Sequence, residues 1–305
     1  MLGRKIKKLK NWLQNRHNLQ LFRLRLAEDR QKTALYRAVL ISHELSATGA
    51  PLMLLAAAEA ILADGGSVRV LAYMDGPLRE KFEKLGIPVF YHPGFRDNAR
   101  LLNEFGGDCA YAVANTAVAY PAVSLLKGPR VLWWIHEAQV IEKDYIARFR
   151  QKKFRPDLEQ TLRQAGKLAV VSDYAREIAA KYNPRVEVIH PAVADVAKEQ
   201  GLQPKQPAEK IRFAMLGAVC EIKGQDVLLK AVRLLPAAYR AQAEFHIAGR
   251  RDGAFAEDLA AESGDLPEVV WEESRSRDNL WDFYRENDVI MVASRDESFS
   301  LVALE

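Results

Sequence analysis

Cysteine and long apolar runs are both scarce in this sequence. The 305 residues include two cysteines, Cys109 and Cys220, which lie far apart in separate apolar, strand-like segments. We expect both to be buried reduced thiols, which favours the cytosol. The longest apolar run, residues 51–63, is too short to cross a bilayer and contains Glu59, so we expect no transmembrane helix. The basic start is not followed by a continuous apolar stretch, so we expect no secretory signal.

Several motifs with known chemistry are also missing. The sequence has no G-x-G-x-x-G, no G-x-x-x-x-G-K-[ST] and no G-x-S-x-G. Their absence argues against dinucleotide-dependent dehydrogenases, P-loop NTPases and α/β-hydrolases. No Asp-x-Asp pair occurs, which disfavours a diphosphate held through a metal ion. The six histidines and two cysteines show no metal-ligand spacing, so we expect no metal site.

The positive charge is concentrated at the N-terminus. The chain has a net charge of +4, yet residues 1–37 hold eleven Lys or Arg and two acidic residues, so the remainder is acidic on balance. Apolar residues spaced by three, four or seven predict a basic amphipathic helix there, which would lie on an anionic membrane or pack on its own domain or a partner. We expect no nucleic-acid partner, because no nucleic-acid-binding module occurs and the rest is acidic.

Apolar, strand-like runs alternate with helical patterns from residue 38 onward. In the first series we expect strands at 38–42, 67–72, 87–92, 109–114, 131–135, 167–172 and 186–190, separated by helices at 51–64, 77–85, 98–105, 116–126 and 173–182. In the second we expect strands at 211–216, 243–248, 268–272 and 289–293, with helices at 224–235, 255–262 and 279–285. Repeated βα units predict parallel sheets covered on both faces.

A change of composition separates the two series. Pro, Gln, Lys and Glu dominate residues 191–210, where apolar periodicity stops. We therefore predict an α/β protein with two Rossmann-like, doubly wound domains facing a cleft. It would comprise a basic arm at 1–37, an N-terminal domain at 38–195, a linker at 196–210 and a C-terminal domain at 211–305. We expect this second domain to be incomplete, because such a domain usually has five or six strands.

The last eighteen residues combine a strand, a polar turn and a helix start. The apolar run 289–293 precedes a turn at 294–298, and a helical pattern begins at Phe299 or Ser300. Glu305 is eight positions after Glu297, which in a helix is roughly 80° beyond two full turns, so both carboxylates can face one crevice. Backbone amides at the helix start between them would suit a diphosphate. The amides and the two carboxylates together would suit a nucleotide-sugar. Spacing alone leaves a structural role open, because such glutamates occur in most α/β domains.

Three other places combine polar groups with strand ends. The first βα turn contains Ser46, Thr48 and Gly49, where a glycine brings bare backbone near a ligand or simply shapes the turn. His136 follows an apolar strand and is either a site residue or a structural histidine. In the segment from Gly217 to Gly224, Lys223 precedes a helix start and would stabilise a leaving diphosphate, unless it is merely solvated.

These motifs together resemble one enzyme family. The segment Asp-Glu-Ser-Phe-Ser-Leu-Val-Ala-Leu-Glu, residues 296–305, resembles the E-x7-E motif of the group 1 (family 4) retaining glycosyltransferases, which have the GT-B fold. The resemblance implies that Glu297 contacts the transferred sugar and Glu305 the ribose, with residues 298–301 beside the donor. It also implies that Lys223, near Gly217, holds the donor phosphates, that His136 lies beside the sugar, and that Ser46, Thr48 and Gly49 border the acceptor. By the same resemblance, the donor-binding residues between the two glutamates would be Ser298, Phe299, Ser300 and Leu301.

Two positions depart from the family pattern. The family usually has Gly where this chain has Ser300, which could cap the helix. It often has Arg where this chain has Ala218; either one cation suffices, or Arg250 or Arg251 compensates.

The predicted activity is transfer of a sugar from a nucleoside diphosphate sugar to a glycan or lipid-linked acceptor. The resemblance implies a retaining hexosyltransferase. We expect it to be metal-independent, because no Asp-x-Asp pair occurs, and to need no cofactor. The scarce cysteines favour the cytoplasm, and the basic amphipathic residues 1–30 favour peripheral contact with the inner membrane face and an acceptor such as an intermediate of bacterial surface polysaccharide synthesis. We expect front-face transfer, because no protein nucleophile is evident. A GT-B epimerase or phosphorylase, and a non-catalytic nucleotide-sugar-binding scaffold, are the alternatives.

Overall fold

The chain divides into two compact units. A computed structural model describes residues 2–142, 158–193, 209–275 and 279–305, and the side chains of 2–14, 16 and 142 are outside that description. Unit 1 comprises Met1–Pro191 and unit 2 comprises Ala192–Glu305. Most of the predicted linker, 196–210, lies outside the described residues.

Unit 1 contains a parallel sheet of seven strands in the order β3-β2-β1-β4-β5-β6-β7. The central strands β1 and β2 are mostly apolar and are buried on both faces along nearly their whole length, and β2 also contains the buried Arg69. In β1, Val39 and Ile41 face one core and Leu40 faces the other. The strands are β1 Arg37–Ser42, β2 Ser67–Ala72, β3 Val89–Tyr91, β4 Tyr111–Asn115, β5 Arg130–Ile135, β6 Lys167–Val170 and β7 Glu187–Val188.

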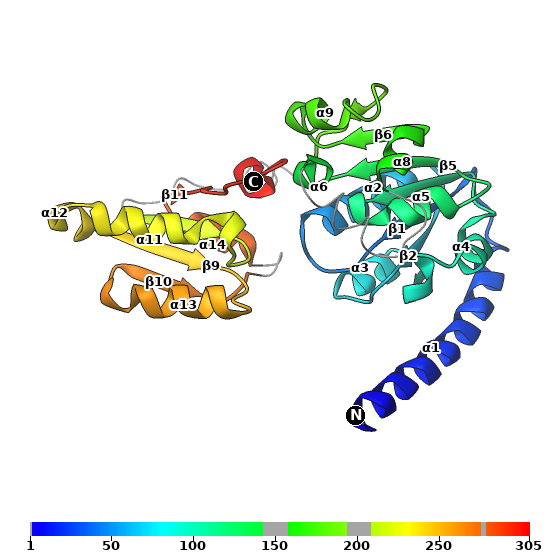
Figure 1. Ribbon diagram of the computed structural model, residues 1–305, viewed down its shortest axis with the longest axis horizontal. Coiled ribbons are helices and arrows are strands. Elements are labelled where there is room, and N and C mark those ends of the chain that lie inside the picture. Colours follow the sequence, from blue (N-terminus) through cyan, green and yellow to red (C-terminus); the bar gives the residue numbers. More distant parts are fainter. Residues whose placement is uncertain (1, 143–157, 194–208, 276–278) are drawn as a thin grey trace. The chain divides into compact units, whose positions relative to one another are not determined.

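Helices cover both faces of this sheet (Figure 1). On one face, Leu54 and Phe82 pack against Leu40, and on the other Leu102 and Phe105 belong to the core that contains Val39. The helical segments are α1 Leu2–Asp29, α2 Gly49–Ala63, α3 Leu78–Lys84, η1 Pro93–Phe95, α4 Ala99–Gly106, η2 Ala117–Ala119, α5 Tyr120–Leu125, α6 Ala138–Glu142, α8 Leu158–Gln164 and α9 Asp173–Ala179.

The strand order creates a topological switch point between β1 and β4. After β1 the chain proceeds to β2 and β3 on one side, and after β4 it proceeds to β5, β6 and β7 on the other. Ligands of open α/β sheets bind at such points, outside the carboxyl ends of the strands. The loops that follow β1 and β4 therefore flank the natural ligand position of unit 1.

The second half of α1 is part of unit 1. Phe22 and Leu26 are buried in the core on the α4 side of the sheet. The ring of Phe22 packs edge-to-face with the rings of Phe90 and Tyr91, at centroid distances of 5.6 and 5.3 Å. Asp29 is 3% exposed and binds the fully buried Arg69 at 2.8 Å. The predicted N-terminal arm is thus a helix, and its second half packs on its own domain.

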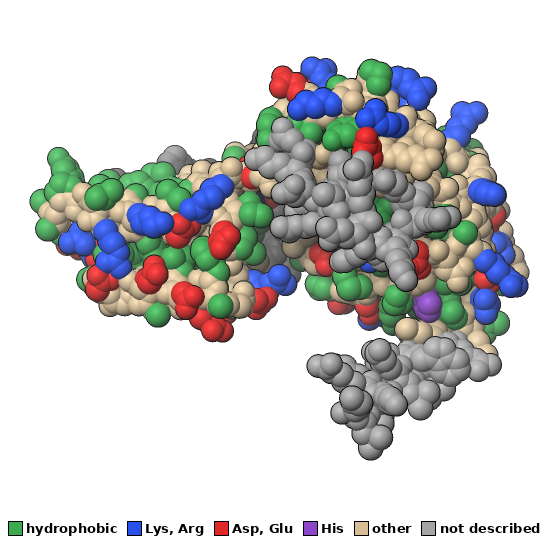
Figure 2. Space-filling model, in the orientation of Figure 1, with side chains coloured by type: hydrophobic (Ala, Val, Ile, Leu, Met, Phe, Trp, Pro, Cys, Tyr) green, Lys and Arg blue, Asp and Glu red, His purple; other side chains and the backbone are tan. Residues whose placement is uncertain are grey.

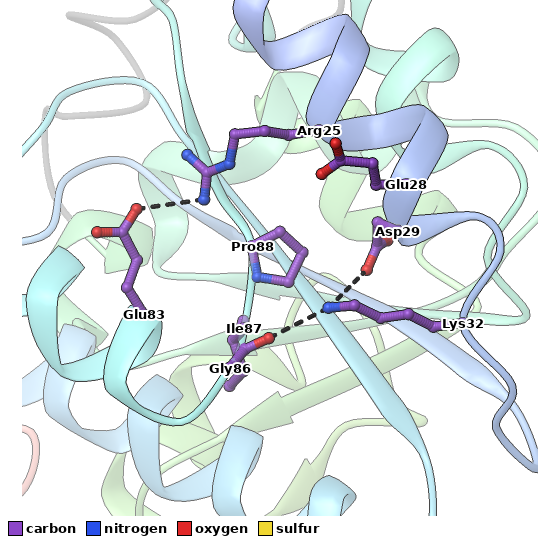
Figure 3. Close-up of a pocket in the computed structure, with 8 residues that line it drawn as sticks. All are labelled: Arg25, Glu28, Asp29, Lys32, Glu83, Gly86, Ile87 and Pro88. Carbon is purple, nitrogen blue, oxygen red and sulfur yellow. Dashed lines mark hydrogen bonds and ion pairs between the residues drawn. The ribbon is translucent and has the colours of Figure 1, made fainter.

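Basic residues of this half of α1 and of the turn after it pair with carboxylates of unit 1. Arg23 in α1 binds Glu104 at 2.6 Å, and Arg30, directly after α1, binds Asp108 at 3.1 Å. Arg25 lies 3.3 Å from a carboxylate of α3 across a crevice of about 220 Å³ (Figure 3). Lys32 on the same crevice donates to Gly86 O at 3.3 Å. These cations are already neutralised or hydrogen-bonded, so the crevice is a seam between α1 and the sheet.

Unit 2 contains a parallel sheet of four strands in the order β10-β9-β8-β11. Val232 and Leu259 pack with Ile247 on one face, and Phe283 covers Ala214 and Ala248 on the other. The elements are β8 Ile211–Leu216, η3 Glu221–Lys223, α11 Gln225–Leu234, α12 Ala237–Arg240, β9 Ala243–Ala248, α13 Ala254–Glu262, η4 Ser263–Asp265, β10 Val269–Glu272, α14 Leu280–Glu286, β11 Val289–Ile290 and α15 Leu301–Leu304. Figure 1 shows the helices on both sides of this sheet.

Several local expectations differ from the structure. The strand expected at 186–190 contains only Glu187–Val188. The strand expected at 289–293 ends at Ile290; Met291 N still donates to Ala214 O at 2.7 Å, and Ala293 O then lies against Gly224, directly before α11. The helix expected at 116–126 is a 3-10 turn followed by α5, with Pro121 in its first turn. Cys109 is buried as expected, whereas Cys220 is half-buried because it lies in the loop before η3. Among the helices described, none is long and apolar enough to span a membrane.

Candidate functional site

The two most informative residues of unit 2 are in direct contact. Lys223 ends η3 and Glu297 lies in the turn after β11, and their side chains form an ion pair of 2.7 Å between Nζ and Oε2. Ser294 donates a hydrogen bond of 3.3 Å to the same carboxylate oxygen. Because β8 and β11 are neighbouring parallel strands, the loops after them meet at the carboxyl edge of the sheet. The side chains of Lys223 and Glu297 are 36% and 27% exposed, so a ligand can reach both.

Backbone contacts hold the two loops together. Gly224 has φ = +77°, and a Cβ there would lie 2.1 Å from the carbonyl oxygen of Ala293, so the position requires glycine. The amide of Arg295 donates to Ile222 O at 2.8 Å. Lys223 therefore lies between two residues whose backbones are fixed to the turn that contains Glu297.

Arg295 adds a side-chain clamp that the sequence reasoning did not identify. Its guanidinium binds both carboxylate oxygens of Asp226 at 2.8 and 2.7 Å and also donates to Glu221 O. These hydrogen bonds from Arg295 hold the pKa of Asp226 well below its usual range. The available signal was spacing, since Asp226 follows Lys223 by three residues and Arg295 precedes Glu297 by two.

The glycine-containing turns after β8 and β9 are in close contact with each other. A Cβ on Gly249 would lie 1.8 Å from Gly217 O, and Val219 donates to Arg250 O at 3.0 Å. Gly217 itself has φ = +142° and open space where a Cβ would point. Of the cations considered as compensation for Ala218, Arg250 pairs with Asp252 and Arg251 with Glu273. Neither salt bridge involves Lys223.

The last part of the motif forms the helix α15, Leu301–Leu304. Ser300 caps α15 by accepting from Ala303 N at 3.2 Å, as its position predicted. Ser298 and Phe299 are half-buried in the turn before it. The carboxylate of Glu305 accepts from Tyr284 Oη at 2.6 Å, whereas Glu297 binds Lys223.

In unit 1, His136 follows β5 and contacts the neighbouring strand end. Its Nε2 lies 2.8 Å from Oδ1 of Asn115, and its ring lies 4.7 Å from that of Trp134. Asn115 is fully buried and also donates to Ala50 O in the first turn of α2 at 2.9 Å. Burial lowers the pKa of His136 to about 4, so the ring is neutral at physiological pH.

The residue after Asn115 has an unusual backbone. Thr116 is fully buried with φ = +76°, a region that β-branched residues avoid. Its carbonyl accepts from the indole of Trp133 at 2.8 Å, and its hydroxyl lies 3.3 Å from Nδ1 of His43. The next amide, Ala117 N, donates to the carboxylate of Glu137 at 3.1 Å. Burial raises the pKa of Glu137.

The predicted acceptor-side residues form a hydroxyl cluster. Ser46 Oγ donates to Glu44 Oε1 at 2.6 Å and lies 2.8 Å from Thr48 Oγ1. Gly49 begins α2, directly before Ala50. Loops after β1, β4 and β5 therefore assemble at the switch point of unit 1. Sequence reasoning found Ser46, Thr48, Gly49 and His136 but missed Asn115, Thr116, His43, Glu44 and Glu137, which become neighbours only through the strand order. Among the residues that the structure describes, no group of His, Cys, Asp or Glu is arranged to hold a metal ion.

Two Rossmann-like units with polar strand-end loops are the architecture of the GT-B class of proteins. The chain belongs to glycosyltransferase family 4: the model of that family, described as Glycosyl-transferase family 4, matches residues 36–193. The model described as Glycosyl transferases group 1 matches residues 197–305. Together the two matches include nearly all of the sequence after α1.

Curated relatives share part of the chain. A D-inositol 3-phosphate glycosyltransferase from Mycolicibacterium gilvum is 31% identical over 164 residues, which is 48% of this chain and 36% of that protein. The enzyme of the same name from Mycolicibacterium vanbaalenii is 34% identical over 142 residues, 40% of this chain and 30% of that protein. The matched region thus spans about a third of the length of these relatives.

Solved structures agree on the fold. Anabaena Alr3699/HepE in complex with UDP-glucose has a TM-score of 0.65 at 15% identity, covering 88% of this chain and 76% of that one. WaaG, a glycosyltransferase involved in lipopolysaccharide biosynthesis, has a TM-score of 0.58 at 14% identity, covering 88% and 77%. At this identity the likeness establishes the fold alone.

Proposed function

We propose that this protein transfers a sugar from a nucleoside diphosphate sugar to a glycan or lipid-linked acceptor, with retention of the anomeric configuration and without a metal ion. The observation that carries the proposal is the contact of Lys223 with Glu297 at the carboxyl edge of the unit 2 sheet. An ammonium suits a diphosphate and a carboxylate suits sugar hydroxyls, and here they lie side by side. The binding of UDP-glucose by Alr3699/HepE makes UDP the first nucleoside diphosphate to test.

In the proposed reaction the acceptor oxygen bonds to the anomeric carbon on the face from which the diphosphate leaves. The bond between that carbon and the diphosphate oxygen breaks as the new one forms, and the acceptor proton passes to the leaving diphosphate. Lys223 would offset the negative charge that develops on the diphosphate. Glu297 would accept hydrogen bonds from the sugar. His136, neutral at physiological pH, would act as a hydrogen-bonding group and not as a cation.

The first test is thermal unfolding with UDP, GDP, ADP and dTDP. A ligand at 100 times its dissociation constant adds about 2.7 kcal/mol to the free energy of unfolding, which raises the midpoint by a few degrees. We expect one nucleotide to produce this shift and Lys223→Ala to abolish it. Lys84→Ala is the control, because it removes an ammonium that pairs with Glu80 at 2.9 Å on the surface of unit 1. A shift that survives Lys223→Ala would remove Lys223 from the site.

The second test follows the product. With the donor identified, NMR of the transferred sugar should show the configuration of the donor, and turnover should continue in EDTA. Lys223→Ala should lower kcat by about 100-fold, the size expected for a group that stabilises developing charge. Release of an epimer or a sugar phosphate without an acceptor would instead indicate the epimerase or phosphorylase. Nucleotide binding without any turnover would indicate the scaffold.

The acceptor proposed is a membrane-surface glycan, as in bacterial surface polysaccharide synthesis. The supporting feature is the first half of α1, where residues 2–13 include five Lys or Arg and no acidic residue. The name of the curated relatives supplies a soluble alternative, an inositol phosphate, which belongs in the same acceptor panel.

Binding to lipid vesicles tests the membrane part of the proposal. Basic residues near an anionic surface contribute about 1 kcal/mol each, so Lys7→Glu with Lys8→Glu should weaken binding to phosphatidylglycerol vesicles by roughly 30-fold or more. Lys84→Glu with Lys181→Glu is the control for net charge, since both lysines are exposed elsewhere on unit 1. Equal binding by both double variants would refute membrane contact through α1.

A further inference from the structure

Asn115 connects two parts of the unit 1 site. It is the last residue of β4, at the switch point, and its side chain is fully buried. Its Nδ2 donates to Ala50 O in the first turn of α2 at 2.9 Å, and its Oδ1 lies 2.8 Å from Nε2 of His136. One amide therefore joins the helix start beside the acceptor-side hydroxyls to the histidine after β5.

The hydrogen bonds of this amide determine which nitrogen of His136 carries the proton. Ala50 O can only accept, so the nitrogen of the Asn115 amide must face it and the oxygen must face His136. That oxygen can only accept, so Nε2 of His136 must donate. A neutral ring has one N–H, which leaves Nδ1 with its lone pair. The low pKa of His136, which burial depresses to about 4, agrees with a neutral ring.

The backbone around Asn115 is held as firmly as its side chain. Thr116 N donates to Trp134 O at 2.8 Å, and the carbonyl of Thr116 accepts from Trp133. Its positive φ turns the chain sharply out of the sheet directly after Asn115. The side-chain amide of Asn115 thus cannot shift toward α2 or His136 unless these backbone contacts break. Strained backbone like that of Thr116 is common at functional sites, where the geometry of the site matters.

We propose that Asn115 is a positioning residue that locks His136 in the Nε2–H tautomer and presents Nδ1 as the acceptor of a hydrogen bond from a substrate hydroxyl. The substrate part of this inference rests on the proposed sugar transfer. The tautomer part rests on the geometry of unit 1 alone. A histidine fixed in this tautomer selects for a hydroxyl group, because a hydroxyl can donate a hydrogen bond to Nδ1 whereas an ether or a carbonyl cannot.

The tautomer is measured by long-range ¹H–¹⁵N NMR of protein labelled at histidine, with His136→Gln used to assign the signals. We expect a pyrrole-type Nε2 and a pyridine-type Nδ1 for His136 at neutral pH. Asn115→Leu, which removes both hydrogen bonds at similar volume, should give a mixture of tautomers. Asn115→Asp retains the acceptor and should keep Nε2–H. A pyrrole-type Nδ1 in the unchanged protein, or an unaltered tautomer in Asn115→Leu, would overturn the proposal.

Asn183 provides the matched control. It is 1% exposed in unit 1, and its Nδ2 donates to Leu162 O and Ala165 O at 3.0 and 2.9 Å. Asn183→Leu should cost folding stability as Asn115→Leu does, yet leave the tautomer of His136 unchanged. If either Leu variant does not fold, Ser at the same two positions gives the same comparison with less strain.

Kinetics separates the tautomer from the proposed function. Asn115→Leu should lower kcat by about tenfold, the effect of one lost hydrogen bond, while the dissociation constant of the nucleoside diphosphate stays unchanged. Asn115→Asp should recover part of this loss. An equal fall of kcat in Asn183→Leu would reduce Asn115 to a structural role. Absence of turnover in every form of the protein would contradict the sugar transfer and, with it, the substrate role of Nδ1, while the NMR result still decides the tautomer.

Discussion

Replacement of Thr116 by Gly should destabilise the protein less than replacement by Ala. Thr116 has φ = +76° and is fully buried, so any side chain there is strained by about 1–3 kcal/mol. Both variants lose the same hydroxyl, which lies 3.3 Å from His43, and the same methyl group. Ala keeps the strain, whereas Gly releases it and loses one buried carbon and some backbone entropy, about 1–2 kcal/mol together. The centres of these ranges, about 2 and about 1.5 kcal/mol, leave Thr116→Gly more stable than Thr116→Ala by about 0.5 kcal/mol.

Thr161 supplies the matched control. It is 3% exposed in α8, where its hydroxyl lies 2.7 Å from that of Ser124. In a helix Gly is less stable than Ala by about 1 kcal/mol, so the order of the two variants should be reversed there. Urea unfolding of the four variants measures both differences, with similar m-values required for the comparison. The same order at both positions would refute the strain assigned to Thr116.

Two further predictions concern unit 2. Glu297→Gln should raise the affinity for UDP alone about two- to fivefold, because Lys223 loses a partner worth about 0.5–1 kcal/mol, while turnover falls. Calorimetry measures the affinity for UDP, with Glu221→Gln as the control for charge. An equal gain of affinity in the two variants would contradict the prediction. Because the hydrogen bonds of Arg295 depress the pKa of Asp226 in the folded protein, this pair stabilises the fold above the unfolded carboxyl pKa of about 3.9 and ceases to do so as pH falls through the folded value. Midpoints measured between pH 7 and pH 3 should therefore decline less in Asp226→Asn, and parallel declines would refute the assignment.

The sequence predicted the elements better than the contacts between them. Apolar runs located most strands because continuous burial in a parallel sheet requires them, and Ser300 was correctly identified as a possible cap. The strand at β11 was overestimated, since nothing in the run 289–293 reveals that Ala293 leaves the sheet to meet Gly224. The apolar pattern of a segment predicts which of its faces are buried. It does not predict the contact between Ala293 and Gly224, which depends on a neighbouring loop.

The candidate site shows the same limit. Lys223 and Glu297 lie 74 residues apart, and resemblance placed both in one site; the structure shows their ion pair. Asn115 and Thr116 gave no signal, because their importance comes from β4 lying beside both β1 and β5. The docking of α1 was one of the alternatives that its basic amphipathic pattern allowed. The acidic partners of its arginines, such as Glu104 and Asp108, are distant in sequence.

The two units solve the same positioning problem in the same way. In unit 1, Asn115 ends the strand beside β1 and binds Ala50 in the first turn of the helix after β1. In unit 2, Arg295 follows the strand beside β8 and binds Asp226 in the first turn of the helix after β8. Each contact closes the switch point of its sheet and fixes one polar residue, His136 or Lys223, whose chemistry the proposed reaction needs. Since helix starts tend to fray and the loops between strands and helices are the mobile parts of such folds, a side-chain link across the switch point keeps the reacting groups in place before any substrate binds.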